Sequence, residues 1–257
     1  EVDLLLLPEM SLTGFSMNTE KTKECKKETV CRIQELAGQY HMAIGAGWVK
    51  DLGTTCENHY SIVSPEGELL DYAKIHPFSY GEESLHFRGG ETLPLCMYRD
   101  FRIGVQICYD LRFPEPFQIL SKEADLIVVP ANWPASRREH WDTLLRARAI
   151  ENQVYVAGVN CAGSMGGQYY SGDSVLYRPD GTNVPAGRKM LSGKEEDRRD
   201  GYAETLCVTF ILSAVSVCAY FARGAAETGG ALRFCIPAVF GGVAGAFLLD
   251  RLPVKVT

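Results

Sequence analysis

Short apolar runs typical of β-strands alternate with amphipathic helical stretches over the first 186 residues of this chain. This alternation favours a layered α/β architecture, because each sheet face and each helix stripe must be covered by another layer. The predicted strands are residues 2–7, 43–48, 59–63, 103–107, 126–129, 154–159 and 174–177. The predicted helices are residues 21–40, 116–122 and 138–152. Turn-forming residues at 64–67 and at 180–181 indicate hairpins within a mixed sheet.

Three stretches of different composition divide the chain. Residues 1–186 carry the α/β pattern, and residues 187–203 form a charged connector without apolar periodicity, which predicts a linker. Residues 204–257 contain two apolar stretches, 205–222 and 234–249, which predict two hydrophobic helices. The first stretch just reaches the length of a membrane span, so the expectation is either contact with a membrane or two buried helices.

The composition excludes several kinds of partner. A net charge of −6 over 257 residues argues against general binding to nucleic acid. Nine cysteines, an odd number without a CxxC pair, predict free thiols in a reducing cytoplasm. Five scattered histidines show no metal-ligand spacing, so no metal is expected. The N-terminal residues lack the basic and apolar regions of a signal peptide.

Two charged residues at predicted strand ends are candidates for proton transfer and charge stabilisation. Glu9 follows the apolar run LLLLP, so its carboxyl group would lie in a low dielectric, which suits an acid that accepts and returns a proton. Lys74 follows a strand-like stretch at residues 69–72, and an amine there could stabilise a thiolate and then an oxyanion. The alternatives are a carboxylate that caps a turn and a solvated lysine, which are the commoner cases for isolated residues.

Cys108 follows the apolar run at residues 103–107 and precedes a turn with the sequence YDLRFP. A turn between a strand and a helix can expose a nucleophile and offer the next backbone N–H, here that of Tyr109, to an oxyanion. A cysteine, a carboxylate and an amine are together the parts of a covalent amide hydrolase. The alternative is an inert buried cysteine, which is what we expect of the other eight.

These residues lie in longer segments with a recognisable order. The segments are LLLLPEMSLTGFS (4–16), YAKIHPF (72–78), GVQICYDLRFPE (104–115) and HWDTLLRARAIENQVYVAGVN (140–160). Together they resemble the carbon–nitrogen hydrolase family, the nitrilase superfamily, over residues 3–185. The resemblance implies an αββα sandwich with a catalytic triad of Glu9, Lys74 and Cys108. It also implies that neither a metal nor an organic cofactor is required.

Within that family, the stretches TGFSM (13–17), PANWPASRREHW (130–141) and SGDS (171–174) are similar to bacterial ω-amidases. This likeness implies hydrolysis of small-molecule amides such as 2-oxoglutaramate, with release of ammonia. Glu9 would take the thiol proton, and Cys108 would attack the amide carbonyl. Lys74 and the N–H of Tyr109 would stabilise the oxyanion, and water activated by the same carboxylate would hydrolyse the thioester. The family also implies a homodimer.

The resemblance extends to residues around the substrate. Glu83 matches the family's second glutamate, although the adjacent Glu82 leaves the match open by one position. Asn132 and Trp133 could line the pocket or serve tight-turn packing. Arg137 could pair with a substrate carboxylate, because a guanidinium group suits bidentate pairing.

Other charged residues are predicted to have structural roles. We expect ion pairs between Arg112 and Glu115 and between Arg148 and Glu151. Arg148 shares a helical face with apolar residues, so it should need a buried partner. His76 precedes a proline that restricts the local backbone, which favours an orienting role over that of a general base.

The chain also departs from the family pattern. A strand and a long helix expected before the glutamate segment are not found, and neither are closing strands after residue 182. Residues 241–256 instead resemble part of a sulfite-exporter-type permease of the TauE/SafE family. The alternatives to an active amidase are therefore an inactive fragment or fusion product with a membrane tail, and an acyltransferase with the nitrilase fold. Fast alkylation of Cys108 relative to the other cysteines would distinguish an active enzyme from an inactive remnant.

Overall fold

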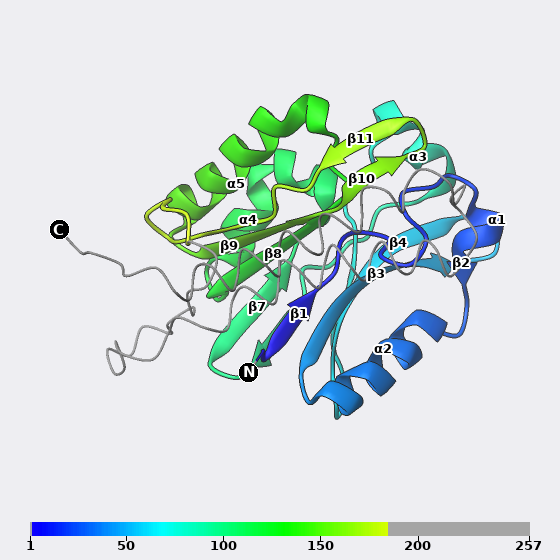
Figure 1. The fold of residues 1–257 in the computed structure, drawn as a ribbon, viewed down its shortest axis with the longest axis horizontal. Helices are drawn as coiled ribbons and strands as arrows, with labels where there is room; N and C mark the ends of the chain where they lie inside the picture. Colours follow the sequence, from blue (N-terminus) through cyan, green and yellow to red (C-terminus); the bar gives the residue numbers. More distant parts are fainter. Residues whose placement is uncertain (1, 185–257) are drawn as a thin grey trace, which may run out of the picture. The chain divides into compact units, whose positions relative to one another are not determined.

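The computed structural model describes residues 2–184, which form a sandwich of two β-sheets between layers of helices (Figure 1). The charged connector and the two apolar stretches predicted beyond residue 186 lie outside the described residues. No helix within residues 2–184 combines the length and the apolar character needed to cross a bilayer.

The first sheet is built from the N-terminal part of the chain. Its strands are β1 (Leu4–Leu6), β2 (Lys23–Glu24), β3 (Ala43–Asp51), β4 (Cys56–Ser64) and β5 (Gly67–Ala73). The order is β1-β3-β4-β5, in which β1 and β2 run parallel to β3 while β3, β4 and β5 are antiparallel. The turn predicted at residues 64–67 is confirmed, because Ser64 pairs with Gly67 where β4 returns as β5.

The second sheet follows in the sequence. Its strands are β6 (Leu95–Tyr98), β7 (Phe101–Val105), β8 (Leu126–Ala131), β9 (Tyr155–Asn160) and β12 (Val175–Tyr177). The order is β12-β9-β8-β7-β6, with a parallel centre and an antiparallel strand at each edge. Along β8, Leu126 and Val128 join the core shared with the first sheet, while Ile127 and Val129 join the core under the helices. This alternation follows from the two-residue period of a strand.

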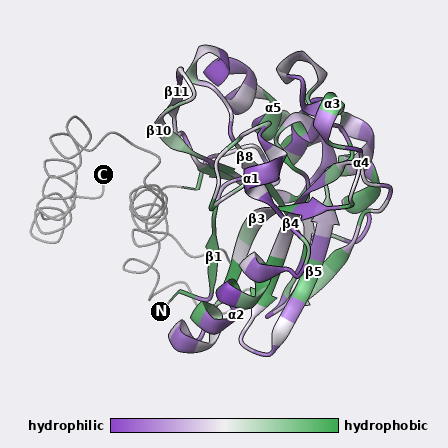
Figure 2. Cartoon of the chain, turned by 90° about the vertical axis from the view of Figure 1, so that its right-hand side faces the viewer, coloured by the Kyte–Doolittle hydropathy of each residue, from purple (hydrophilic) through white to green (hydrophobic). Residues whose placement is uncertain are grey.

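Helices cover the outer faces of the two sheets (Figure 1). They are α2 (Glu28–Tyr40) on the first sheet, and α4 (Pro114–Leu120) and α5 (Arg138–Asn152) on the second. Helix α2 buries Val30, Ile33 and Ala37 against β3 and β4. Figure 2 shows hydrophobic and hydrophilic residues together on α2, as expected of a helix with one face on a sheet. The layers therefore follow the order helix, sheet, sheet, helix.

Most predicted boundaries shift by one to three residues, and two of the differences have an evident structural cause. The helix predicted at residues 21–40 is interrupted: α1 (Thr19–Thr22) ends where Lys23 pairs with Val49 of β3, and α2 begins only after Lys27, which has a φ of 54°. Pairing with a distant strand here overrides the local helical pattern. The strand predicted at residues 103–107 ends at Val105, because the chain turns at Ile107.

Besides β2, three strands were not predicted. They are β6 and the two strands of a hairpin, β10 (Ala162–Met165) and β11 (Gln168–Ser171). The hairpin is mostly exposed to solvent, so it lacks the apolar alternation by which a half-buried strand is recognised.

Candidate active site

Glu9 lies in the turn that follows β1, and its side chain is almost fully buried. The turn lies directly on β3, because the N–H of Ser11 donates to the carbonyl of Gly47 at 3.0 Å. A Cβ atom at position 47 would collide with the backbone of Met10. The missing side chain therefore allows the close approach that brings the Glu9 carboxyl group inside the sandwich.

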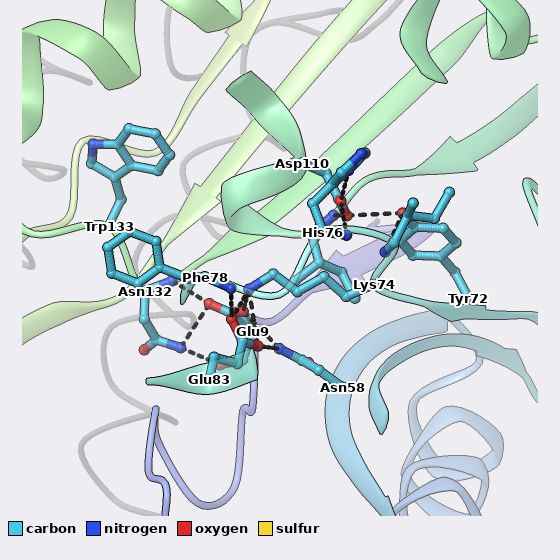
Figure 3. A network of polar contacts seen from close by, with 12 residues as sticks. Glu9, Asn58, Tyr72, Lys74, His76, Phe78, Glu83, Asp110, Asn132 and Trp133 are labelled. Carbon is cyan, nitrogen blue, oxygen red and sulfur yellow. Dashed lines mark hydrogen bonds and ion pairs between the residues drawn. The ribbon is translucent and has the colours of Figure 1, made fainter. Parts of the chain in front are cut away.

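Lys74 follows β5 and is 1% exposed (Figure 3). Its Nζ lies 2.9 Å from Oε1 of Glu9 and 2.8 Å from Oε2 of Glu83. Burial alone would lower the pKa of Lys74, but the charges of Glu83 and Glu9 raise that pKa well above its usual value. The lysine is therefore a fixed cation between two carboxylates.

The second glutamate of the site is Glu83, which resolves the choice left open by the sequence. Glu83 is fully buried at the start of α3 (Glu83–His86), whereas Glu82 is exposed and has a φ of 62°. The backbone N–H of Phe78 donates to Oε2 of Glu83 at 2.6 Å. A buried carboxylate that accepts hydrogen bonds from a backbone N–H and an ammonium group is part of the buried polar network around Lys74 and is not a surface charge.

Cys108 begins the 3₁₀ helix η2 (Cys108–Arg112) immediately beyond β7 and is partly exposed. Its φ of 48° is uncommon for a residue other than glycine and marks a strained turn. Burial of the thiol and the nearby charge of Glu9 raise the pKa of Cys108 well above its usual value, although Lys74 acts in the opposite direction. The side chain of Cys108 is thus a protonated thiol at neutral pH.

The buried carboxylate of Asp110 holds the turn at Cys108 in place. It accepts hydrogen bonds from the N–H of Ile107 at 2.9 Å, the hydroxyl of Tyr72 at 2.8 Å and the N–H of His76 at 2.8 Å (Figure 3). The ring Nδ1 of His76 also lies 2.8 Å from Asp110. Since Tyr72 and His76 flank Lys74 in sequence, Asp110 connects the lysine segment to the cysteine turn. The structure therefore places His76 where the predicted orienting role requires it.

Asn132 and Trp133 follow β8 and both line the pocket. The backbone N–H of Asn132 donates to Oε2 of Glu9 at 3.0 Å, and its side-chain amide donates to the Glu9 carbonyl at 2.9 Å. Trp133 is held through its backbone N–H by the side chain of Asn160 and through its ring N–H by the carbonyl of Arg137. Asn132 thus fixes Glu9 from the second sheet, in addition to forming part of the pocket wall.

A pocket of about 300 Å³ opens in front of these residues. Its walls include Phe15, Lys74, Phe78, Tyr80, Cys108, Tyr109, Arg112, Asn132, Trp133, Arg137 and Tyr170. Of the predicted site residues, only Glu9 and Glu83 are absent from this wall, because they lie behind Lys74. The pocket is therefore lined by apolar and aromatic side chains and by three cations.

The predicted ion pair between Arg112 and Glu115 is wrong, because no such pair forms within residues 2–184. The Arg112 guanidinium lies 5.0 Å from the ring centroid of Trp133, and its Nη2 lies 3.2 Å from Nδ1 of His140. Stacking on an aromatic face of the pocket replaces the local helical pair. The second predicted pair, Arg148 with Glu151, is confirmed at 2.8 Å.

Asn58, Asp110 and Arg112 belong to the site but were not predicted as site residues. Asn58 lies in the middle of β4, where its side-chain amide contacts Glu9 at 2.8 Å and Glu83 at 3.0 Å. Asn58 directly precedes the strand predicted at residues 59–63, and its polar neighbours Glu57 and His59 are also buried in β4, so no sequence signal singles it out. Within residues 2–184, no group of three His, Cys, Asp or Glu side chains could hold a metal ion.

Comparison with known proteins gives consistent matches. The carbon–nitrogen hydrolase family model matches residues 1–190. The chain is 38% identical over 175 residues to the omega-amidase YafV of Yersinia enterocolitica, which covers 68% of each protein. It is 32% identical over 199 residues to the 2-oxoglutaramate amidase of Bacillus subtilis, which covers 76% of this chain and 75% of that protein.

A solved structure is similar over the same part of the chain. A CN-hydrolase superfamily protein from Xanthomonas campestris, with an arsenic adduct in its active site, has a TM-score of 0.66 and 35% sequence identity. The match covers 70% of this chain and 72% of that chain. The family match stops at residue 190, so the expected likeness of residues 241–256 to a permease has no support.

Proposed function

Because the chain belongs to the carbon–nitrogen hydrolase family, we propose that it hydrolyses the amide bond of a small molecule through a thioester on Cys108. One observation carries this proposal. A buried ammonium group between two buried carboxylates lies next to a partly exposed cysteine in the wall of a pocket. The arrangement supplies a nucleophile, a proton acceptor and a cation for an oxyanion.

The first half-reaction forms the thioester. Cys108 starts as a thiol, because burial and Glu9 raise its pKa. Glu9 accepts the thiol proton while the sulfur attacks the amide carbonyl, and the carbonyl oxygen becomes an oxyanion. Lys74, whose pKa is raised by Glu83 and Glu9 despite burial, stays charged and stabilises that oxyanion together with the N–H of Tyr109. Glu9 then returns the proton to the leaving nitrogen, which departs as ammonia.

The second half-reaction hydrolyses the thioester. Water loses a proton to Glu9 and attacks the same carbonyl carbon, so that Lys74 again lies near the developing negative charge. The carbon–sulfur bond breaks, Cys108 regains its proton from Glu9, and the carboxylic acid product leaves. Glu9 and Lys74 therefore have the same roles in both steps, whereas Cys108 is the nucleophile in the first and the leaving group in the second.

The proposed substrate is an amide that carries a carboxylate at its other end. Arg112 and Arg137 line the same pocket as Cys108, and neither forms an ion pair within the described part of the chain. A substrate carboxylate would satisfy these guanidinium groups. The relative from Bacillus subtilis is a 2-oxoglutaramate amidase, and 2-oxoglutaramate carries a carboxylate opposite its amide. We therefore propose ω-amidase activity on 2-oxo acid amides.

Ammonia release from 2-oxoglutaramate tests the proposal, with Cys108→Ala as the negative control. Glutaramate and pentanamide form a matched pair for the specificity, because they have the same chain length and differ in the terminal carboxylate. We expect release from 2-oxoglutaramate and glutaramate, weak release from pentanamide, and none from the variant. Equal rates for the matched pair would contradict the carboxylate requirement. Activity that survives in Cys108→Ala would contradict the thioester mechanism.

A further inference from the structure

Asn58 closes a ring of four buried side chains (Figure 3). Its amide nitrogen donates to Oε1 of Glu9 at 2.8 Å and to Oε1 of Glu83 at 3.0 Å. Lys74 contacts the same two oxygens, at 2.9 Å and 3.1 Å. All four side chains are at most 1% exposed. Asn58 and Lys74 thus bridge the two carboxylates from opposite sides.

The charges in this ring explain why a neutral donor is needed. Two carboxylates share one ammonium group in a space that excludes water, so one negative charge has no cation of its own. An amide NH₂ group offers two hydrogens without adding charge, and each hydrogen can stabilise one carboxylate. An aspartate at this position would add a third negative charge, and an apolar residue would leave an oxygen of each glutamate with one donor fewer.

The contacts also distinguish the two oxygens of Glu9. Oε1 accepts from both Lys74 and Asn58, which fills its two lone pairs. Oε2 accepts from the backbone N–H of Asn132 at 3.0 Å and, weakly, from its side-chain amide at 3.3 Å. Asn132, which holds Oε2, lines the pocket together with Cys108, whereas Asn58, which shares Oε1 with Lys74, does not. Oε2 is therefore the Glu9 oxygen that is held by a residue of the pocket wall.

We propose that Asn58 is a positioning residue that directs proton transfer at Cys108 to Oε2 of Glu9 by occupying Oε1 together with Lys74. This inference rests on the amide hydrolysis proposed above. Asn58 also holds the two carboxyl groups side by side around Lys74, so that Glu83 supports the lysine while Glu9 faces the cysteine turn.

The first test replaces Asn58 by alanine. Because only the proton acceptor loses its position, kcat for 2-oxoglutaramate should fall by about 10- to 100-fold while KM changes by less than about twofold. The folded state is checked by the thermal unfolding midpoint. A folded Asn58→Ala variant with a kcat within about twofold of the unmodified enzyme would overturn the proposal.

The second test uses charge and does not depend on turnover. In Asn58→Asp, a further carboxylate faces Glu9 and Glu83, the two carboxyl groups that lie beside Lys74. The pH at which iodoacetamide alkylation of Cys108 reaches half its maximal rate should therefore rise, as should the acidic limb of kcat/KM. The matched control is Asn18→Asp, which makes the same change on an exposed side chain and should leave both profiles unchanged. An unshifted alkylation profile in Asn58→Asp would overturn the proposal.

A double variant covers the case in which the single variants do not fold. Adding Glu83→Gln to Asn58→Asp restores two carboxylates, one ammonium group and one side-chain amide to the ring. We expect the thermal midpoint and the alkylation profile to recover in part, whereas strictly additive losses would overturn the proposal. Failure of the proposed amide hydrolysis can be recognised separately. If the unmodified enzyme releases no ammonia, the alkylation experiment still tests the role of Asn58, because alkylation does not require turnover.

Discussion

At the scale of single residues, the structure gives the nucleophile an unfavourable resting state. Cys108 has a strained φ of 48° and a thiol whose pKa is raised by burial and by Glu9. A free thiolate is therefore scarce at neutral pH, which limits unwanted oxidation of the sulfur. The same property makes the reaction depend on a proton acceptor that acts during the attack.

Glu9→Gln should therefore remove most of the activity while keeping the size of the side chain. We expect kcat for 2-oxoglutaramate to fall by about 10²- to 10⁴-fold, the range that general acid–base catalysis contributes. Because the charge of Glu9 raises the pKa of Cys108, its removal should lower that pKa, so alkylation of Cys108 at neutral pH should become faster although turnover is lost. Glu139→Gln, which makes the same change on an exposed helix residue, is the matched control and should behave like the unmodified enzyme. Unimpaired turnover in Glu9→Gln would assign the proton transfer to another group.

Arg112 should affect substrate choice more than chemistry. In Arg112→Gln, kcat/KM for glutaramate should fall by about 10- to 100-fold, because a hydrogen bond to a charged group is worth about 1.5–3 kcal/mol. The value for pentanamide should change little, since that amide has no carboxylate. Arg32→Gln removes an exposed guanidinium group that does not line the pocket, and it serves as the control. A similar loss for both amides would show that Arg112 supports the fold of the pocket instead.

At the scale of elements, the sequence predicts the layers better than the details of the site. The αββα arrangement expected of a nitrilase-type fold is confirmed, because continuous apolar runs such as that of β8 predict strands that are buried on both faces. The strand ends near Glu9, Lys74 and Cys108 were found for the same reason. The contact of Asn58 with Glu9 and the stacking of Arg112 on Trp133 form only when distant parts of the chain come together. No local sequence pattern therefore predicts them.

Asp110 should control the stability of the turn that carries the nucleophile. In Asp110→Asn, an amide NH₂ group would face the donors of Tyr72, His76 and Ile107. We expect the free energy of unfolding to fall by about 2–4 kcal/mol, because buried donors lose their acceptor. Chemical denaturation measures this change. Asp100→Asn, at an exposed turn, should change it by less than about 0.5 kcal/mol; equal effects at the two positions would contradict the role of Asp110.

At the scale of the whole molecule, a second charged network supports the first sheet away from the pocket. His59 is 4% exposed, and its two ring nitrogens lie 2.6 Å from Asp71 and 2.9 Å from Glu57. Lys27 contacts Asp71 at 2.8 Å, and Arg88 contacts Glu57 at 2.8 Å. The network thus joins the start of α2 to β4 and β5, and to the segment that follows α3.

This network should make the fold sensitive to acid. Burial would raise the pKa of Asp71 and of Glu57, but hydrogen bonds from His59 lower both pKa values below their usual range. Such carboxylates stabilise the fold above their unfolded pKa, and that stability is lost as the pH falls through the lower folded pKa. The thermal midpoint should therefore decrease between about pH 5 and pH 3.

The slope of that decrease should depend on His59. We expect His59→Gln to flatten the dependence of the thermal midpoint on pH over this range, because the carboxylates lose the hydrogen bonds that lower their pKa values. His86→Gln, at a partly exposed position, should keep the slope of the unmodified protein. If the thermal midpoint of His59→Gln depends on pH as steeply as that of the unmodified protein, other groups must cause the sensitivity to acid.

The origin of the site in two sheets has a consequence for how the protein matures. Glu9, Asn58 and Lys74 come from the first sheet, while Cys108 and Asn132 come from the second. A chain in which only one sheet has formed therefore has a cysteine without its base, or a base without its cysteine. The proposed thioester formation needs both halves, so the reactivity of the Cys108 sulfur can be used to measure when the two sheets come together during folding.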